Sequence, residues 1–166
     1  MEPTTAIDTE ARAGQPPLRD TLVGVARQWQ ERYGVAPAIT ATISELDAAL
    51  LIGMADDEDA ADCASRTAVT KGHDFTHNGT RYQVKANRPS GKKGSPVTLV
   101  AKAKNLEWDR LIWLLYNTDY TLAEAWMWEV EDYEREITPL TYSRPNHLRA
   151  GHDLLATPSG TTRSAL

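Results

Sequence analysis

The chain has 166 residues, of which 41% are hydrophobic and 25% are charged, and this fits one globular domain with a buried core. No segment approaches the roughly 20 apolar residues that a membrane-spanning helix needs, so no membrane partner is expected. Cys63 is the only cysteine, which excludes a disulfide within the chain and predicts a reducing, cytoplasmic location.

The charges are distributed unevenly along the chain. The net charge is −5, yet residues 71–110 contain nine Lys or Arg and three acids, so this segment carries +6 and the remainder −11. A local basic patch can bind a polyanion even when the whole protein is acidic, because binding depends on the local potential. The alternative is a chance cluster on a solvated surface.

The N-terminal third predicts a tail and two helices. Residues 1–17 are polar and include a Pro-Pro pair, which predicts a flexible tail. Residues 18–33 predict a helix that ends at Gly34, because apolar side chains recur there at helical spacing. A second helix is predicted from Thr40 to about residue 52, followed by five acids between residues 56 and 62 in an exposed loop or short helix.

The middle of the chain changes to the two-residue period of strands. Residues 67–76 and 80–86 predict two strands, and Asn78-Gly79 between them predicts a tight hairpin turn. A basic loop over residues 88–96 and a third strand over residues 97–102 are expected next.

The C-terminal half predicts two further strands and one helix. Residues 111–116 are continuously apolar, which fits a central strand covered on both faces. Residues 122–130 suit a helix by their Ala and Glu and a strand by their alternation, and the strand is favoured. A helix is predicted over residues 131–137. Residues 18–140 would form the folded domain, and residues 141–166 an irregular tail.

The predicted hairpin places three polar side chains on one face. If Asn78 and Gly79 are the two loop residues, Asp74 lies opposite Gln83, and Lys85 shares their face because side chains alternate along a strand. The other face of the hairpin carries Phe75, Tyr82 and Val84, and it has the apolar character of a core surface.

An acid, an amide and an amine close together suit hydrolysis of a phosphodiester. Asp74 is a suitable ligand for a hard cation that neutralises charge and activates water, and Lys85 can orient the water and stabilise the transition state. Glu45, on the second helix, is the best candidate for a second carboxylate. The alternative is a solvated hairpin face with mixed charges.

These residues resemble the PD-(D/E)xK nuclease superfamily, whose members have the restriction-endonuclease-like fold. Its pattern is a helix bearing Glu, an acid at one strand and then acid-x-Lys on the next. Here the pieces are ISELDAALLIG with Glu45, KGHDF with Asp74, and RYQVK with Gln83 and Lys85. Gln83 stands where most members have an acid, which is similar to the Mrr-type branch with Gln-x-Lys. The resemblance covers about residues 41–117.

The resemblance implies an α/β fold with a mixed central sheet of four strands flanked by helices. It implies DNA cleavage that depends on Mg²⁺ or Mn²⁺, in defence or repair. Asp74, Glu45 and the Val84 carbonyl would hold the metal, Lys85 would serve the attacking water, and Gln83 would assist. The protein would dimerise or act beside a partner protein to cut both strands.

Other side chains are candidates for DNA binding or for the core. The candidates for phosphate contact are Lys71, Arg88, Lys92 and Lys93, and the alternative for residues 88–93 is a solvated loop without such a role. The tryptophans at 108, 113, 126 and 128 favour packing in the core or at a subunit interface over base stacking. The six acids between residues 124 and 136 should face away from DNA.

Two other functions remain open. One is a DNA-binding or assembly subunit with this fold that has lost catalysis, which the amide at Gln83 favours. The other is a protein-interaction module that uses the acidic surfaces. Salt dependence separates them, because phosphate contacts weaken steeply with added salt.

Overall fold

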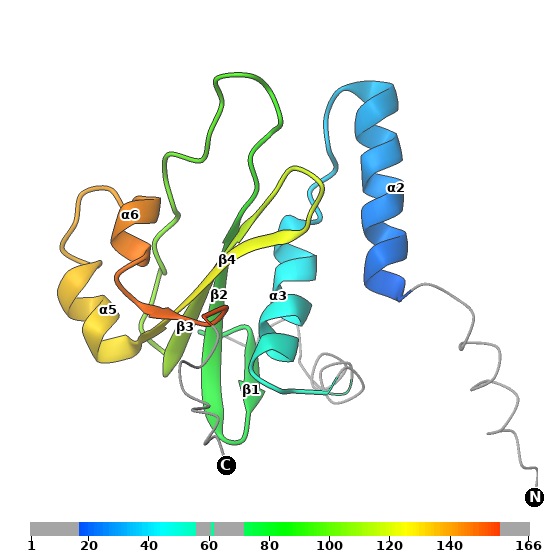
Figure 1. Cartoon of the computed structure of the whole chain (residues 1–166). Helices are drawn as coiled ribbons and strands as arrows, with labels where there is room; N and C mark the ends of the chain where they lie inside the picture. The colour runs from blue at the N-terminus through cyan, green and yellow to red at the C-terminus, as the bar shows by residue number, and fades with distance from the viewer. Residues whose placement is uncertain (1–16, 56–60, 62–71, 157–166) are drawn as a thin grey trace, which may run out of the picture. The chain divides into compact units, whose positions relative to one another are not determined.

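The computed structural model describes residues 17–55, 61 and 72–156 (Figure 1). The chain divides into two units, Met1–Ile39 and Thr40–Leu166. Several predicted features lie outside the described residues: the tail before residue 17, the acids between 56 and 62, Cys63 and Lys71. None of the described helices is long and apolar enough to cross a membrane.

The first unit contains helix α2 (Leu18–Tyr33), with the bounds that the sequence predicted. Gly34 ends the helix in the left-handed conformation, and its N–H donates to the Gln30 carbonyl at 2.8 Å. Ala26 is buried, whereas the apolar residues that predicted the helix are exposed, among them Trp29 at 51%.

The second unit is built on a mixed five-stranded sheet in the order β1-β2-β3-β4-β5 (Figure 1). Strands β2 and β3 are parallel, and the other neighbouring pairs are antiparallel. The strands are β1 (Phe75–His77), β2 (Thr80–Asn87), β3 (Arg110–Tyr116), β4 (Leu122–Glu129) and β5 (His152–Asp153). The predicted mixed α/β class is confirmed, and the strand interpretation of residues 122–130 is confirmed as well.

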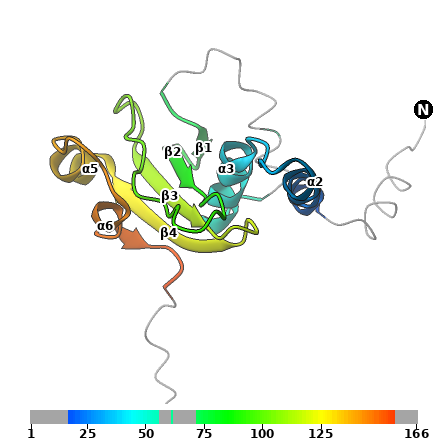
Figure 2. The same cartoon turned by 90° about the horizontal axis from the view of Figure 1, so that it is seen from above.

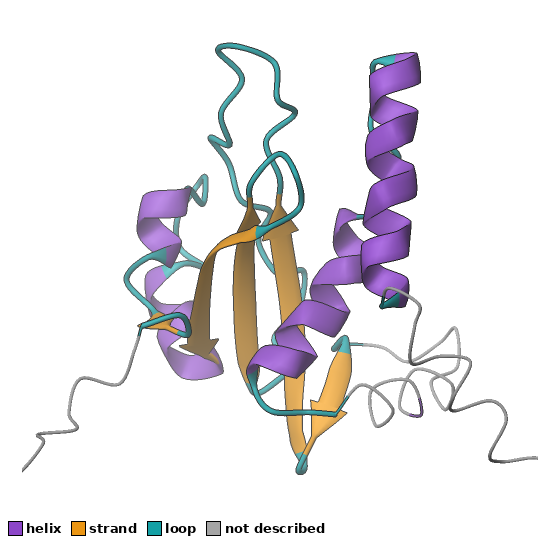
Figure 3. Cartoon of the chain, turned by 45° about the vertical axis from the view of Figure 1, so that its right-hand side comes forward, coloured by secondary structure: helices purple, strands orange, loops and turns teal. Residues whose placement is uncertain are grey.

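Helices lie on both faces of this sheet (Figures 2 and 3). Helix α3 (Thr40–Leu51) packs on one face, where the Tyr116 hydroxyl donates to the Asp47 carboxylate at 2.6 Å. Strand alternation puts Val84, which is paired with Ile112, on this same face. Helices α5 (Val130–Glu136) and α6 (Pro145–Leu148) lie on the other face.

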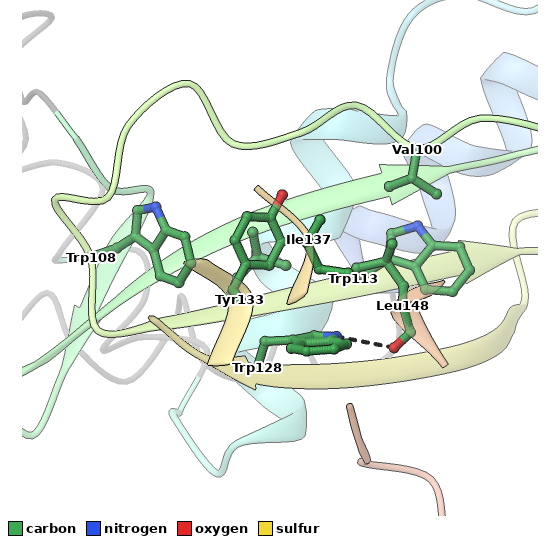
Figure 4. Packing of buried hydrophobic residues seen from close by; sticks show 8 residues of the cluster. Val100, Trp108, Trp113, Trp128, Tyr133, Ile137 and Leu148 are labelled. Carbon is green, nitrogen blue, oxygen red and sulfur yellow. Dashed lines mark hydrogen bonds between the residues drawn. The ribbon is translucent and has the colours of Figure 1, made fainter. Parts of the chain in front are cut away.

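The core on the α5 and α6 face is rich in tryptophan (Figure 4). Trp108, Trp113 and Trp128 are at most 5% exposed, and Trp126 is partly buried against them, so the prediction of core packing is confirmed. Tyr133 of α5 packs edge-on against the rings of Trp108 and Trp128, at centroid distances of 5.3 and 6.3 Å. Trp128 Nε1 donates to the Leu148 carbonyl at 3.0 Å.

Two predictions about the second unit are wrong. Residues 97–102 form no strand, because Val100 turns into the core and its N–H donates to the Ser143 carbonyl, in an irregular segment. Residues 141–156 are not an irregular tail: they contain α6 and β5, and Leu148 is buried in the core. Elements of two and four residues are too short to show a hydrophobic period.

Candidate active site

The β1–β2 hairpin has the predicted two-residue turn. Asn78 and Gly79 both have positive φ, of 49° and 78°, which is typical of the type I′ turn that Asn-Gly favours. The register pairs Phe75 with Tyr82, and their rings stack at a centroid distance of 4.9 Å. This register sets Asp74 beside Gln83, as predicted.

We expect Gly79→Ala to lower the free energy of unfolding by about 1 kcal/mol, because a side chain is strained at positive φ. Urea titration of both proteins measures the difference. Gly24→Ala in α2 is the matched control, since no atom lies within 4 Å of its Cβ position and alanine favours a helix. Equal losses from the two changes would contradict the role of the turn.

The Asp74 carboxylate lies at the open edge of β2. Strand β1 begins only at Phe75, so beyond it no strand among the described residues borders the outward N–H and C=O groups of β2. Asp74 Oδ2 takes the place of a strand partner by accepting the Val84 N–H at 2.6 Å. The Asp74 N–H donates to the Tyr82 carbonyl at 2.8 Å, so the aspartate is held by its backbone and its side chain.

The Gln83 amide joins Asp74 to the Val84 carbonyl. Gln83 Nε2 donates to Asp74 Oδ2 at 2.6 Å and lies 3.4 Å from the Val84 oxygen. The carboxylate, the carbonyl and the amide therefore converge on one point. Carboxylate and carbonyl oxygens are the ligands that Mg²⁺ and Mn²⁺ prefer, so this donor set fits a hard cation.

Lys85 and Glu45 lie on different faces of the sheet. Lys85 is half-buried and shares a strand face with Gln83, on the side of the tryptophan core. Glu45 is half-buried on α3, which packs against the opposite face. The structure thus brings Asp74, Gln83 and Val84 together. Within the described part of the chain, no three His, Cys, Asp or Glu side chains are grouped to hold a metal.

An ion pair that the sequence did not predict lies next to the site. Asp109 accepts the Arg81 backbone N–H at 2.8 Å and the guanidinium through Nε and a terminal nitrogen at 3.1 and 2.9 Å. These hydrogen bonds lower the pKa of Asp109 to about 2. The Asp109 N–H in turn donates to the Arg81 carbonyl at 2.9 Å, so the pair extends the contact between β2 and β3 by one residue. Residues 28 apart in sequence carry no pattern that links them.

We expect Asp109 to stabilise the fold above about pH 4 and to lose this contribution as the pH falls toward 2. The reason is that the unfolded chain binds the proton more readily than the folded one. Both side chains are over 40% exposed, so the effect is small and decreases with salt. In urea titrations between pH 2 and 7, Asp109→Asn should differ from the native protein most at neutral pH. A difference that grows toward pH 2 would refute the assignment.

Gly72, just before the hairpin, has no room for a side chain. Its φ is +101°, and a Cβ atom there would lie 2.5 Å from Oε2 and 2.7 Å from Cβ of Glu107. The Glu107 side chain therefore packs against the backbone two residues before Asp74. No sequence pattern predicts this contact, since only the fold brings residue 107 to residue 72.

Much of the basic segment is engaged within the protein. Arg88 donates to the Thr118 carbonyl through two nitrogens and stacks over the Tyr120 ring at 4.1 Å, so it holds the β3–β4 turn. Internal partners also engage Arg81, Lys102 and Arg110. Lys92 and Lys93 are exposed in the loop that follows β2.

Models of known protein families gave no match to this chain, and curated protein sequences gave none either.

Proposed function

We propose that this protein is a metal-dependent nuclease with a restriction-endonuclease-like core that hydrolyses DNA phosphodiester bonds. The observation that supports the proposal most is the convergence of the Asp74 carboxylate, the Gln83 amide and the Val84 carbonyl at the open edge of β2. The acid of the predicted pattern directly precedes β1 and its Gln-x-Lys lies on β2, with the acid and the amide in contact.

Each residue has a distinct part in this proposal. Asp74 and the Val84 carbonyl would hold Mg²⁺ or Mn²⁺, and Glu45 would add a carboxylate from α3. The cation, when bound, supplies charge neutralisation and lowers the pKa of water. Lys85 would orient the attacking water and stabilise the negative charge that develops on the phosphate oxygens. Before the cation binds, Gln83 holds the Asp74 carboxylate in place by its hydrogen bond.

Plasmid and linear DNA incubated with the purified protein test the proposal. We expect cleavage with Mg²⁺ or Mn²⁺, no cleavage with EDTA, and loss of cleavage in Asp74→Ala. Cleavage that persists in EDTA or in Asp74→Ala would reject this site. Nicked plasmid on the gel would indicate cutting of one strand, and linear plasmid would indicate cutting of both strands. Cutting of both strands is the result expected of a dimer or of an enzyme that acts beside a partner.

A DNA-binding subunit without catalysis is the second candidate function. The observation that favours it is the amide of Gln83, a weaker cation ligand than the acid that most members of the resembled superfamily have there. This function predicts DNA binding that is unchanged by EDTA and no cleavage under any metal condition. Gel-shift assays of the same samples at several salt concentrations separate the two functions.

We expect the double variant Lys92→Ala, Lys93→Ala to weaken DNA binding equally for all sequences and to lower the slope of log affinity against log salt by about 2. The reason is that each exposed lysine would neutralise one phosphate. Fluorescence anisotropy between about 50 and 200 mM salt measures the slope. The slope for Lys104→Ala, a single change elsewhere in the same basic segment, is measured for comparison. An unchanged slope in the double variant would exclude this loop from the interface.

A further inference from the structure

The side chain of Gln83 lies at the point where the two oxygen ligands of the proposed cation site meet. Its Nε2 atom is 2.6 Å from Asp74 Oδ2, a short contact for a nitrogen donor, and 3.4 Å from the Val84 carbonyl. An amide NH₂ group has two donors and can point one at each oxygen. The nitrogen thus satisfies the same oxygens that a cation would satisfy.

The orientation of this amide follows from electrostatics. Asp74 Oδ2 accepts two hydrogen bonds, one from the Val84 N–H and one from Gln83 Nε2, and both donors stabilise negative charge on that oxygen. If the amide were turned by 180°, its oxygen would face the carboxylate oxygen at the same distance, and two acceptors would repel each other. The nitrogen therefore faces Asp74 as long as no cation separates the two oxygens.

We propose that Gln83 is a positioning residue that closes the cation site with its own NH₂ group and opens it by turning the amide over. The inference rests on the proposed cation site at Asp74. When a divalent cation binds, the NH₂ group leaves the point between Asp74 and Val84, and the Gln83 oxygen turns toward the cation. Breaking the hydrogen bond between Gln83 and Asp74 offsets part of the binding free energy, so the site binds cations more weakly than its ligands alone would allow.

An acid at this position would behave differently. A glutamate has no NH₂ group to donate, and in the absence of a cation it would bring a second negative charge against Asp74. Cation binding would then relieve repulsion, whereas in the native protein it must break a hydrogen bond. The presence of glutamine therefore makes the site closed at low cation concentration and open only when the cation is abundant.

Two amide groups report separately on the site and on Gln83. The Val84 backbone N–H donates to Asp74 Oδ2, so its NMR resonance reports cation binding at Asp74. The side-chain NH₂ resonances of Gln83 report the hydrogen bond between Gln83 and Asp74. Titration of the isotope-labelled full chain with MgCl₂ follows both. We expect one Gln83 proton to start downfield and slow to exchange, and to lose both properties with the same midpoint as the Val84 shift.

The outcomes are distinguishable. A Val84 shift with an unchanged Gln83 hydrogen bond would overturn the inference and leave the proposed cation site in place. No shift at either group up to high MgCl₂ would overturn both the inference and the cation site. A Gln83 side chain that exchanges freely before any cation is added would also overturn the inference, because the closed state would then not form.

A second measurement uses a variant. We expect Gln83→Glu to bind Mn²⁺ at least tenfold more tightly than the native protein in calorimetric titration. Gln28→Glu adds the same charge on the exposed surface of α2 and should leave the affinity unchanged. Affinity in Gln83→Glu that does not exceed that of Gln28→Glu would overturn the inference, since loss of the donor and gain of a carboxylate both favour the cation.

Discussion

Lys85→Ala should lower the rate of DNA cleavage by about a hundredfold to a thousandfold while the protein stays folded. The lysine lies two residues from Gln83 on the same face of β2, where Arg81 is paired with Asp109, and removing a group that stabilises transition-state charge has an effect of this size. Because the lysine would act on the transition state, the loss should appear in kcat with little change in KM. Single-turnover cleavage of a labelled duplex measures it.

The controls for Lys85 separate the effect of its charge from a loss of folding. Lys85→Arg preserves the charge and should retain more activity than Lys85→Ala. Lys104→Ala removes a charge from the same basic segment and should cleave normally. Unfolding midpoints of all three variants show whether the fold is intact. Full activity in a folded Lys85→Ala protein would show that Lys85 has no part in the cleavage mechanism.

Trp113→Ala should lower the free energy of unfolding by about 3–5 kcal/mol, the range for removal of a large aromatic side chain from a core. Trp113 is fully buried on the central strand of the sheet (Figure 4), and its Nε1 donates to the Asn87 side-chain oxygen at 2.9 Å. The variant loses apolar contacts and leaves an acceptor on β2 without its donor. Since domains of this size are stable by about 5–15 kcal/mol, urea titration will show a large shift in the midpoint.

A tryptophan on the surface gives the matched control. Trp29 is 51% exposed on α2, and Trp29→Ala should change the free energy of unfolding by less than about 1 kcal/mol. A small loss from Trp113→Ala, equal to that from Trp29→Ala, would mean that the core tolerates the cavity. Lys85 pairs with Trp113 across β2 and β3, so a disturbed core would also displace Lys85.

The sequence predicted the local features of the fold and missed the long-range ones. Helix α2 and the Asn78-Gly79 turn depend on neighbouring residues, so period and turn chemistry were enough to predict them. The contact between Asp74 and Gln83 followed from the turn, because a two-residue loop fixes the register. The pair of Arg81 with Asp109 and the packing of Glu107 on Gly72 required the parallel pairing of β2 and β3, which no local pattern contains.

The position of Glu45 shows a further limit of sequence reasoning. The resemblance placed this residue among the metal ligands, and the structure puts its helix on the face of the sheet opposite Gln83 and Lys85. A glutamate on α3 would have to reach the open edge of β2 from that side. Comparing Glu45→Gln with Asp74→Asn in the Mn²⁺ titration would show whether both carboxylates contribute to one site.

The parallel pairing of β2 with β3 also has a consequence for how the chain folds. A parallel pair needs a crossover, and here residues 88–109 supply it without a helix among them. Strands β3 and β4 are joined by a short turn, and closing a short loop costs little conformational entropy, so this hairpin should form early. Strand β2 must then find β3 across a long irregular connection, which raises the contact order and slows folding. The contact between β2 and β3 would therefore be among the last parts of the sheet to form, so a newly made chain acquires the β1–β2 hairpin, with its candidate active site, and the β3–β4 hairpin before the two are joined.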